Sequence, residues 1–171
     1  ISYYAKQINP RIKIVGVQAE GADAIVQSFQ QKKHCSTKRV NTIADGIAVM
    51  NPGEKTVKLI QENVDEMVSV DDEIAATILL LLEREKLVVE PAGASSLAAV
   101  LNHKMDVTAK RVVCVLSGGN IDVSFIHKVV EKGLVTRGRN IKFKTLMLDV
   151  PGSLEHFAHI VKEANANIIE V

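Results

Sequence analysis

Residues 111–120, RVVCVLSGGN, constrain the fold more than any other segment, because a short apolar run leads directly into two glycines. The run at 112–116 is rich in β-branched residues and has the length of a central strand in a parallel sheet. Gly118 and Gly119 permit a sharp turn and a close approach of the backbone to a ligand at the strand's carboxyl end, where open α/β sheets bind small molecules. The segment predicts a ligand-binding loop of an α/β domain, with a plain strand–turn–helix as the alternative.

Strand-type and helix-type segments alternate before residue 133. Besides 112–116, strands are expected at 12–17 and 66–70, and Asp71 or Asp72 is expected to cap the helix that runs to about residue 85. The other expected helices are 1–8, one ending near 31, 54–62, 90–102 and 123–132. This alternation predicts a three-layer α/β/α fold with a mostly parallel sheet covered on both faces.

The pattern changes after Gly133, where a polar linker spans 136–140. Residues 141–149 alternate apolar and polar side chains, as a half-exposed strand does. A helix is expected from 153 to about 165, and a further strand at 168–171. This is one βαβ unit, so we expect two domains, 1–139 and 140–171.

Composition and charge limit the partners of the chain. The 21 basic and 20 acidic residues leave a net charge of +1, which gives no nucleic-acid footprint. The longest apolar run, 78–82, is far too short to span a membrane. Two cysteines, Cys35 and Cys114, favour a reducing, cytoplasmic location. Both ends of the chain interrupt a pattern, so we expect a piece of a longer protein.

Four segments fall where an α/β fold builds a site: 18–23, 44–46, 90–94 and 117–120. Each also has a purely structural interpretation. Glu20 and Asp23 suit a solvated helix start, Asp45 with Gly46 suits a turn, and Glu90 suits the positive end of the helix that follows it. A nucleotide-binding loop at 117–120 is a weak alternative, because the chain has no G-x-G-x-x-G or Walker pattern.

The order of these segments resembles the threonine dehydratase (threonine ammonia-lyase) family of pyridoxal-phosphate fold-type-II enzymes. The matching text is IVGVQAEGA, TIADGIAV, VVEPAGASSLAAV and VVCVLSGGNID. The resemblance implies a partial fold-type-II domain, the cofactor pyridoxal 5'-phosphate, and dehydration of L-threonine or L-serine by β-elimination to a 2-oxo acid and ammonia. Whether the pathway is isoleucine biosynthesis or threonine breakdown stays open.

The resemblance also implies roles for four residues. Ser117 matches the serine that hydrogen-bonds the pyridine nitrogen of the cofactor, and Gly118 lies beside the ring. Gly46 matches a glycine whose backbone packs against the ring region, and Glu90 matches a glutamate near the ring hydroxyl or the substrate. A hydroxyl partner leaves the ring nitrogen largely unprotonated, which suits β-elimination.

Other family features are expected to be absent from this chain. None of its lysines stands in a motif that matches the Schiff-base lysine, so no catalytic residue is assigned and the chain alone is expected to be inactive. Where relatives hold a divalent metal with carboxylates, the matching positions are Gln18 and Ala24, which predicts no divalent metal. Because the carboxylate of Glu20 is close to these positions in the sequence, a site for a monovalent ion stays an alternative.

The tail LDVPGSLEHFAHIVKEANANIIEV resembles the opening βαβ unit of an ACT domain, a small ferredoxin-like regulatory module. The resemblance implies an amino-acid effector bound by Asp149, Pro151 and Gly152 at an interface between two such modules, and a homo-oligomer, dimer or tetramer. The alternative function is an amino-acid-binding regulatory module with a non-catalytic α/β scaffold.

Overall fold

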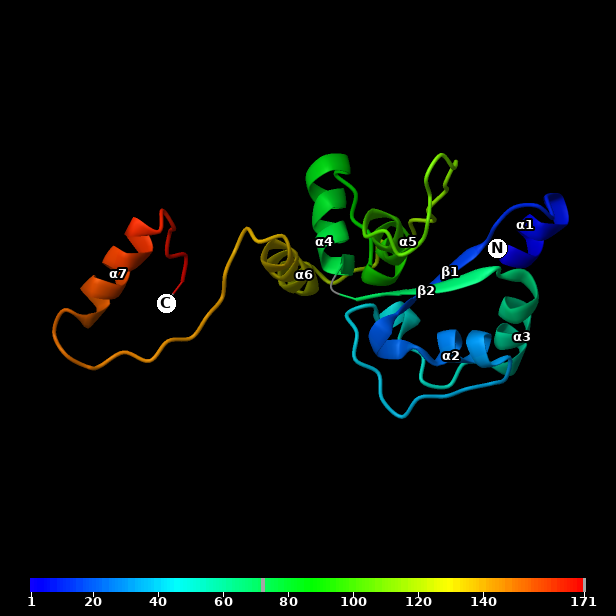
Figure 1. Ribbon diagram of the computed structural model, residues 1–171, viewed down its shortest axis with the longest axis horizontal. Coiled ribbons are helices and arrows are strands. Elements are labelled where there is room, and N and C mark those ends of the chain that lie inside the picture. The colour runs from blue at the N-terminus through cyan, green and yellow to red at the C-terminus, as the bar shows by residue number, and fades with distance from the viewer. Residues whose placement is uncertain (72, 171) are drawn as a thin grey trace. The chain divides into compact units, whose positions relative to one another are not determined.

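The computed structural model describes residues 1–71 and 73–170, which divide into two compact units, Ile1–Asn140 and Ile141–Val171. Helices and strands follow one another along unit 1, and a single helix stands in unit 2 (Figure 1). The elements are α1 (Ser2–Ile8), β1 (Val15–Ala19), η1 (Glu20–Ala22), α2 (Ala24–Gln31), η2 (Asp45–Ile47), α3 (Glu54–Asn63), β2 (Glu66–Val70), α4 (Glu73–Leu80), η3 (Leu81–Glu85), α5 (Pro91–Leu101), α6 (Val123–Thr136) and α7 (Ser153–Glu163).

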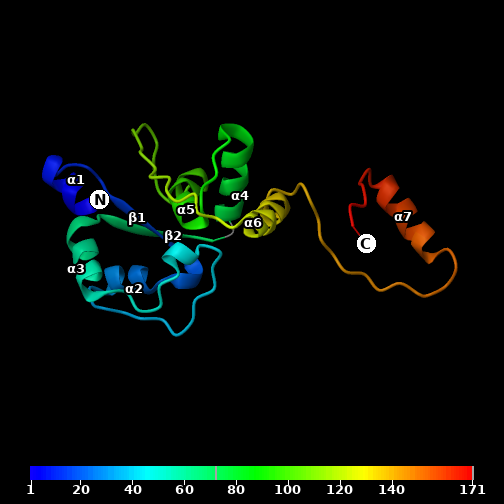
Figure 2. The ribbon, with the colours of Figure 1, turned by 180° about the vertical axis from the view of Figure 1, so that it is seen from behind.

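Unit 1 is built on a parallel pair of strands, β1 and β2. Their register runs from Val15 opposite Glu66 to Ala19 opposite Val70, so the carboxyl ends of the two strands lie side by side. Helices α2 and α3 lie on one side of the pair, with α4 and α5 on the other, which both Figure 1 and Figure 2 show. The predicted α/β class, with helices on both faces of a parallel sheet, is confirmed.

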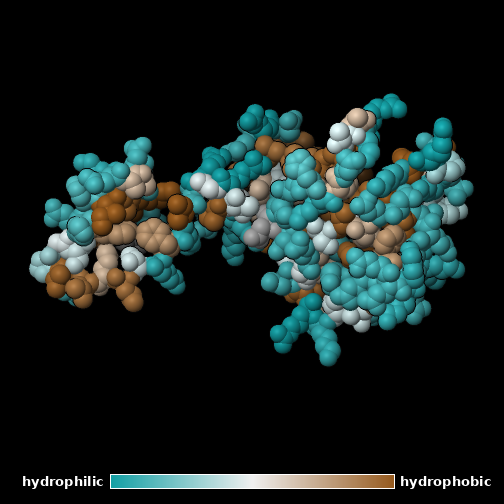
Figure 3. All heavy atoms as spheres, viewed as in Figure 1, coloured by the Kyte–Doolittle hydropathy of each residue, from teal (hydrophilic) through white to brown (hydrophobic). Residues whose placement is uncertain are grey.

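The core of unit 1 lies between the sheet and the helices α4, α5 and α6. Its buried residues are Ala44, Val70, Ile74, Ala75, Ile78, Leu81, Val89, Ala94, Ala98, Ala99 and Val129. Small side chains permit close helix packing: a Cβ on Gly133 of α6 would lie 2.8 Å from the carbonyl oxygen of Ala75 in α4. Figure 3 shows hydrophilic residues covering the α2 and α3 side of the unit.

The strand predicted at 112–116 is not formed, and the sheet of the described residues holds two strands rather than a larger set. Val113 is 89% exposed, so the run is not the buried central strand that its composition suggested. A strand needs a neighbouring backbone to satisfy its N–H and C=O groups. Here the hydroxyl of Ser96 in α5 donates to the carbonyl of Val115 at 2.9 Å instead.

The βαβ prediction for the tail is also wrong for the described residues. Helix α7 forms, but residues 141–149 and 168–170 form no strand, and Val171 lies outside the described residues. The segment supplies alternating side chains, but unit 2 as described offers no paired backbone for a ladder. Figure 3 shows hydrophobic residues gathered on the surface of this unit.

The predicted long helix after β2 is divided. It ends as an α-helix at Leu80 and continues through one π-helical turn, η3, before Lys86 adopts a left-handed backbone with φ 58°. Of its two predicted caps, Asp72 lies outside the described residues. Across residues 1–71 and 73–170, no helix combines the length and apolarity that crossing a membrane requires.

Candidate functional site

The start of α5 and the Ser-Gly-Gly loop are joined through Glu90 and Gly118. Glu90 occupies the position before the first helical residue, Pro91, and its backbone N–H donates to the carbonyl of Gly118 at 2.7 Å. The carbonyl of Glu90 in turn accepts from the N–H of Ala94 at 3.0 Å. Pro91 has no N–H group that would need an acceptor, so it suits the first position of a helix that begins beside the loop.

Two glycines make this close contact possible. A Cβ on Gly93 would lie 1.7 Å from the carbonyl oxygen of Ser117, so the loop backbone occupies the place of a side chain. Gly118 has φ +73°, a left-handed conformation that favours glycine, and a Cβ there would lie 2.0 Å from Cδ of Glu90. Gly93 has no role predicted from the sequence, although its position within EPAGA was the available signal.

Gly46 of η2 completes the group. A Cβ on Gly46 would lie 3.0 Å from Cβ of Ala92 and 3.7 Å from Oε1 of Glu90. The structure therefore brings together all four residues predicted to contact the cofactor, from three separate segments of sequence. We call Gly46, Glu90, Gly93, Ser117 and Gly118 the Glu90–Gly118 cluster.

Charged residues meet at the carboxyl ends of the two strands. The ammonium of Lys104 lies 2.8 Å from Oε1 of Glu73 and 3.5 Å from Oε1 of Glu20. Its hydrogen bond to Glu73 raises the pKa of Lys104. Burial raises the pKa of Glu73, but hydrogen bonds from Lys104 and from the Asp71 backbone outweigh it, and the pKa lies below its usual range. This contact of Lys104 could not be predicted from the sequence, because 84 residues separate Lys104 from Glu20.

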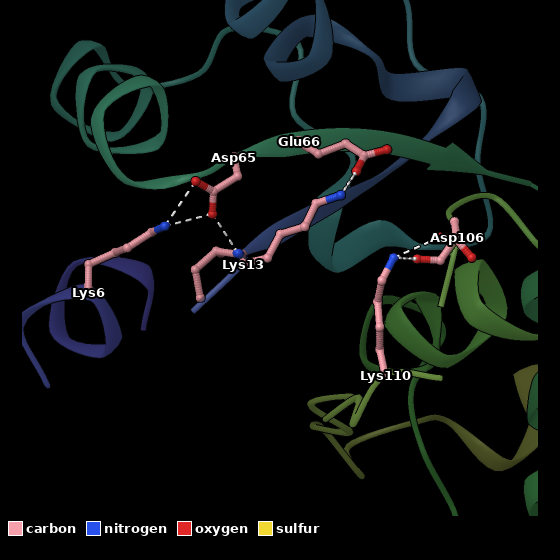
Figure 4. A network of polar contacts seen from close by, with 7 residues as sticks. Lys6, Lys13, Asp65, Glu66, Asp106 and Lys110 are labelled. Carbon is pink, nitrogen blue, oxygen red and sulfur yellow. Dashed lines mark hydrogen bonds and ion pairs between the residues drawn. The ribbon is translucent and has the colours of Figure 1, made fainter. Parts of the chain in front are cut away.

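A second polar network lies at the amino ends of the strands (Figure 4). Asp65 accepts hydrogen bonds from the backbone N–H of Ile14 at 2.7 Å and from the ammonium of Lys6 at 2.7 and 2.9 Å. The bond from Ile14, followed by that from Lys6, lowers the pKa of Asp65. Lys13 pairs with Glu66 at 2.5 Å, so this network links the segment that leads into β1 to the start of β2.

Gln18 and Ala24, the residues at the positions where relatives have metal-binding carboxylates, lie in β1 and α2. Gln18 is 4% exposed and donates from Nε2 to the carbonyl of Ile47 at 2.6 Å, and Ala24 is fully buried. Within the part of the chain that the structure describes, no three His, Cys, Asp or Glu side chains are grouped as metal ligands.

The two cysteines are both half-buried. Burial raises the pKa of the Cys114 thiol, whose sulfur lies 3.8 Å from the carbonyl oxygen of Ser96. A raised thiol pKa lowers the thiolate fraction and therefore the reactivity of Cys114.

The predicted effector residues Asp149, Pro151 and Gly152 are all exposed in unit 2. Gly152 has φ +89°, immediately precedes α7, and leaves open space where a Cβ would stand. These three residues therefore form one exposed turn at the start of the helix.

Two hollows of about 300 and 400 Å³ lie along α4 rather than at the Glu90–Gly118 cluster, and share Leu80 and Leu101. Polar side chains that line the larger hollow already have partners within the protein. Thr77 donates to the carbonyl of Glu73 at 2.7 Å, Arg137 donates to the carbonyl of Ala76 at 3.3 Å, and Glu73 pairs with Lys104 at 2.8 Å. We therefore place the candidate site at the cluster, where backbone and carboxylate groups converge.

Comparison with known proteins shows the family of the chain. The family model described as "Pyridoxal-phosphate dependent enzyme" matches residues 1–118. Two relatives named L-threonine ammonia-lyase, from Thermotoga maritima and Geobacter sulfurreducens, are 45% identical over 172 residues and 46% identical over 164 residues. These matches cover 100% and 95% of this chain but 43% and 41% of the relatives, so the chain spans less than half of their length.

Solved structures agree with the sequence comparison. The processed form of threonine deaminase isoform 2 from Solanum lycopersicum is 34% identical with a TM-score of 0.68, covering 77% of this chain and 39% of that one. Maize serine racemase is 33% identical with a TM-score of 0.67, covering 77% of this chain and 43% of that one.

Proposed function

Because the chain belongs to the pyridoxal-phosphate-dependent enzyme family, we propose that residues 1–139 form the C-terminal part of a catalytic domain that dehydrates L-threonine. The products are 2-oxobutanoate and ammonia. The single observation that carries the proposal is the identity of 45% to an L-threonine ammonia-lyase along the whole chain. The alternative of a regulatory module on a non-catalytic scaffold is not favoured, because the family match lies in unit 1.

The Glu90–Gly118 cluster fits a flat aromatic cofactor. Gly93 in α5, Gly118 in the loop that carries Ser117 and Gly46 in the η2 turn lack side chains, which lets these three segments approach one another closely. Their backbones can then line one narrow site for a flat ring. When bound, pyridoxal phosphate supplies an electron sink for the electron pair released at the substrate's α-carbon.

We assign the chain's own residues as follows. The Ser117 hydroxyl hydrogen-bonds the pyridine nitrogen and, being a neutral partner, does not hold a proton there. Gly118 and Gly46 orient the ring by backbone contact. The Glu90 carboxylate, held beside Gly118 by the bond from its own N–H to the Gly118 carbonyl, faces the ring hydroxyl or the substrate.

Regulation and assembly belong to the same proposal. Residues 140–171 resemble part of an ACT domain in sequence, although the described residues form only its helix, α7. In this proposal Asp149, Pro151 and Gly152, at the turn before α7, contact an amino-acid effector at an interface between two modules. This arrangement implies a homo-oligomer. The two free cysteines favour a cytoplasmic location.

Replacing Ser117 tests the proposed role directly. In the holoenzyme that contains this chain, Ser117→Ala removes one hydrogen bond to the cofactor, so turnover of L-threonine is expected to fall about tenfold. The free energy of unfolding of the apo form should change little, because Ser117 is exposed. Ser36→Ala, an exposed loop serine remote in sequence from the cluster, is the matched control. Unchanged kinetics in cofactor-loaded Ser117→Ala would overturn the assignment.

The 171-residue chain assayed alone is a second test. We expect it to form no 2-oxobutanoate, because none of its lysines matches the family's Schiff-base lysine. Detection of the 2-oxo acid by reduction with a coupled dehydrogenase, above a threonine-free blank, would refute this expectation.

A further inference from the structure

Gln18 is a buried residue outside the Glu90–Gly118 cluster, and its side chain bonds to the turn that carries Gly46 of the cluster. It stands in β1 opposite Ser69 of β2, near the carboxyl end of the strand pair. Its side chain is almost fully buried, and its amide Nε2 donates to the carbonyl of Ile47 at 2.6 Å across 29 residues of sequence. Burying an amide is unfavourable unless it is hydrogen-bonded, so this bond is costly to remove.

The acceptor belongs to the turn that carries Gly46. Within η2 the hydrogen bonds are local: Ile47 N–H donates to the carbonyl of Ala44, and Ala48 N–H to the carbonyl of Asp45, both at 3.0 Å. The N–H of Gly46 is bonded to the side chain of Asp45 at 2.8 Å. Such bonds set the shape of the turn, but they do not fix its position against α5.

The same end of β1 fixes the approach to the turn. The N–H of Asn41 donates to the carbonyl of Gly21 at 2.9 Å, and a Cβ on Gly21 would lie 1.8 Å from the carbonyl oxygen of Asn41. The incoming chain is therefore held at Gly21 and the turn itself at Gln18. The sheet, through β1, sets where Gly46 meets Glu90.

We propose that Gln18 is a positioning residue of the active site, whose buried amide holds η2 so that the backbone of Gly46 faces the cofactor ring beside Glu90. This inference rests on the proposed function only in naming pyridoxal phosphate as the ligand. Gln18 touches neither substrate nor cofactor. It acts through the carbonyl of Ile47.

The chain contains a matched control for the test. Gln61 of α3 also donates its amide Nε2 to a backbone carbonyl, that of Ser28, at 2.7 Å across 33 residues. Gln18→Met and Gln61→Met therefore remove the same kind of hydrogen bond with the same change of side chain. Gln18→Glu keeps the shape of the side chain but replaces the donor by a carboxylate that faces a carbonyl, and serves as a second variant if the methionine packs poorly.

The first measurement is amide hydrogen exchange in the apo form of the enzyme that contains this chain. In Gln18→Met and Gln18→Glu, the N–H groups of Ile47 and Ala48 are expected to exchange about tenfold faster, because local opening of the turn is no longer opposed by the Gln18 bond. In Gln61→Met their exchange should match the wild type. Equal exchange at Ile47 and Ala48 in the Gln18 and Gln61 variants would overturn the proposal.

The second measurement is pyridoxal phosphate binding by equilibrium dialysis, with threonine kinetics in parallel. We expect the Kd for the cofactor to rise about tenfold in Gln18→Met and not in Gln61→Met, with kcat falling and KM for threonine nearly constant. A Gln18→Met variant that binds the cofactor like Gln61→Met contradicts the positioning role. If the wild-type enzyme binds pyridoxal phosphate but does not deaminate threonine, the proposed reaction fails while the binding and exchange results still decide the role of Gln18.

Discussion

The two units of the chain use similar local patterns with different results. In unit 1, β1 and β2 pair, and Ile74, Ile78 and Ala94 are buried in one core with Val70 of β2. In unit 2, α7 forms but buries none of its residues, and Leu146 is fully exposed. Helix α7 closes its hydrogen bonds within itself, whereas a strand depends on a second backbone. The comparison shows that local sequence is enough for a helix, while a sheet requires its partner.

The largest expected effect distinguishes the cores of the two units. Ile74→Ala removes a fully buried side chain of α4 from the core of unit 1 and should lower the free energy of unfolding by about 3 kcal/mol. Leu154→Ala in α7 removes a side chain that is 55% exposed and should change it by less than about 0.5 kcal/mol. Urea denaturation followed by circular dichroism measures both. Equal losses of unfolding free energy in the two variants would show that Leu154 contributes to stability as much as a buried core residue does.

The next effect concerns crowding in unit 1. Gly118→Ala adds a Cβ at φ +73° and 2.0 Å from Cδ of Glu90, so we expect a loss of about 2 kcal/mol. Gly138→Ala carries the same backbone strain at φ +66° with nothing within 4 Å, and should cost about 1 kcal/mol. Gly118→Ala is thus expected to cost more stability than Gly138→Ala. In a background that carries Glu90→Ala, this extra cost of Gly118→Ala should disappear. If the extra cost persists in that background, it does not arise from the Glu90 side chain.

A smaller effect tests how β1 is fixed to β2. Asp65→Asn should lower the free energy of unfolding by about 1 kcal/mol at neutral pH, a modest value because the side chain is 40% exposed and screened by solvent. The pKa of Asp65 is lowered in the folded chain, so its contribution is present above about pH 4 and is lost as pH falls further. Denaturation of both proteins at about pH 7 and about pH 3 should show a smaller difference at the lower pH. A difference that grows on acidification would contradict the role of the ionised carboxylate.

The smallest effect is expected in unit 2. The rings of Phe143 and Phe157 lie 6.0 Å apart at 58°, a tilted pair in an otherwise exposed unit. Phe157→Ala should shift the main unfolding transition by less than about 0.5 kcal/mol, because that transition reports the core of unit 1. Differential scanning calorimetry measures it. A shift as large as that of Ile74→Ala would mean that the two units unfold together.

Segments with a strong local pattern of residues were the ones that the sequence predicted well. β2 occupies the predicted residues 66–70, and the helices α1, α3 and α5 lie within about two residues of their predicted ends. The predicted pyridoxal-phosphate family is confirmed by the family match. The strands predicted at 112–116, 141–149 and 168–171 failed at the described residues, because apolar composition does not provide a pairing partner.

The candidate site divides in the same way. Gly46, Glu90, Ser117 and Gly118 were named from motifs, and the structure brings them together, while their roles toward a cofactor stay predictions. Gln18 and Lys104 carried no motif that pointed to their contacts. Their partners lie 29 and 84 residues away, at distances in sequence that only the folded chain closes.

The contact of Gly93 with Ser117 bears on the thermodynamics of ligand binding. A loop that rests on a helix through side chains can shift as those side chains change rotamer, but the carbonyl of Ser117 occupies the place of a Cβ on Gly93. There is no intervening layer to rearrange, so Ser117 and Gly118 share the rigidity of the first turn of α5. A ligand that binds there meets a preorganised surface and loses little affinity to ordering the loop. Affinity at this edge is therefore set by the complementarity of the ligand rather than by the entropy of the loop.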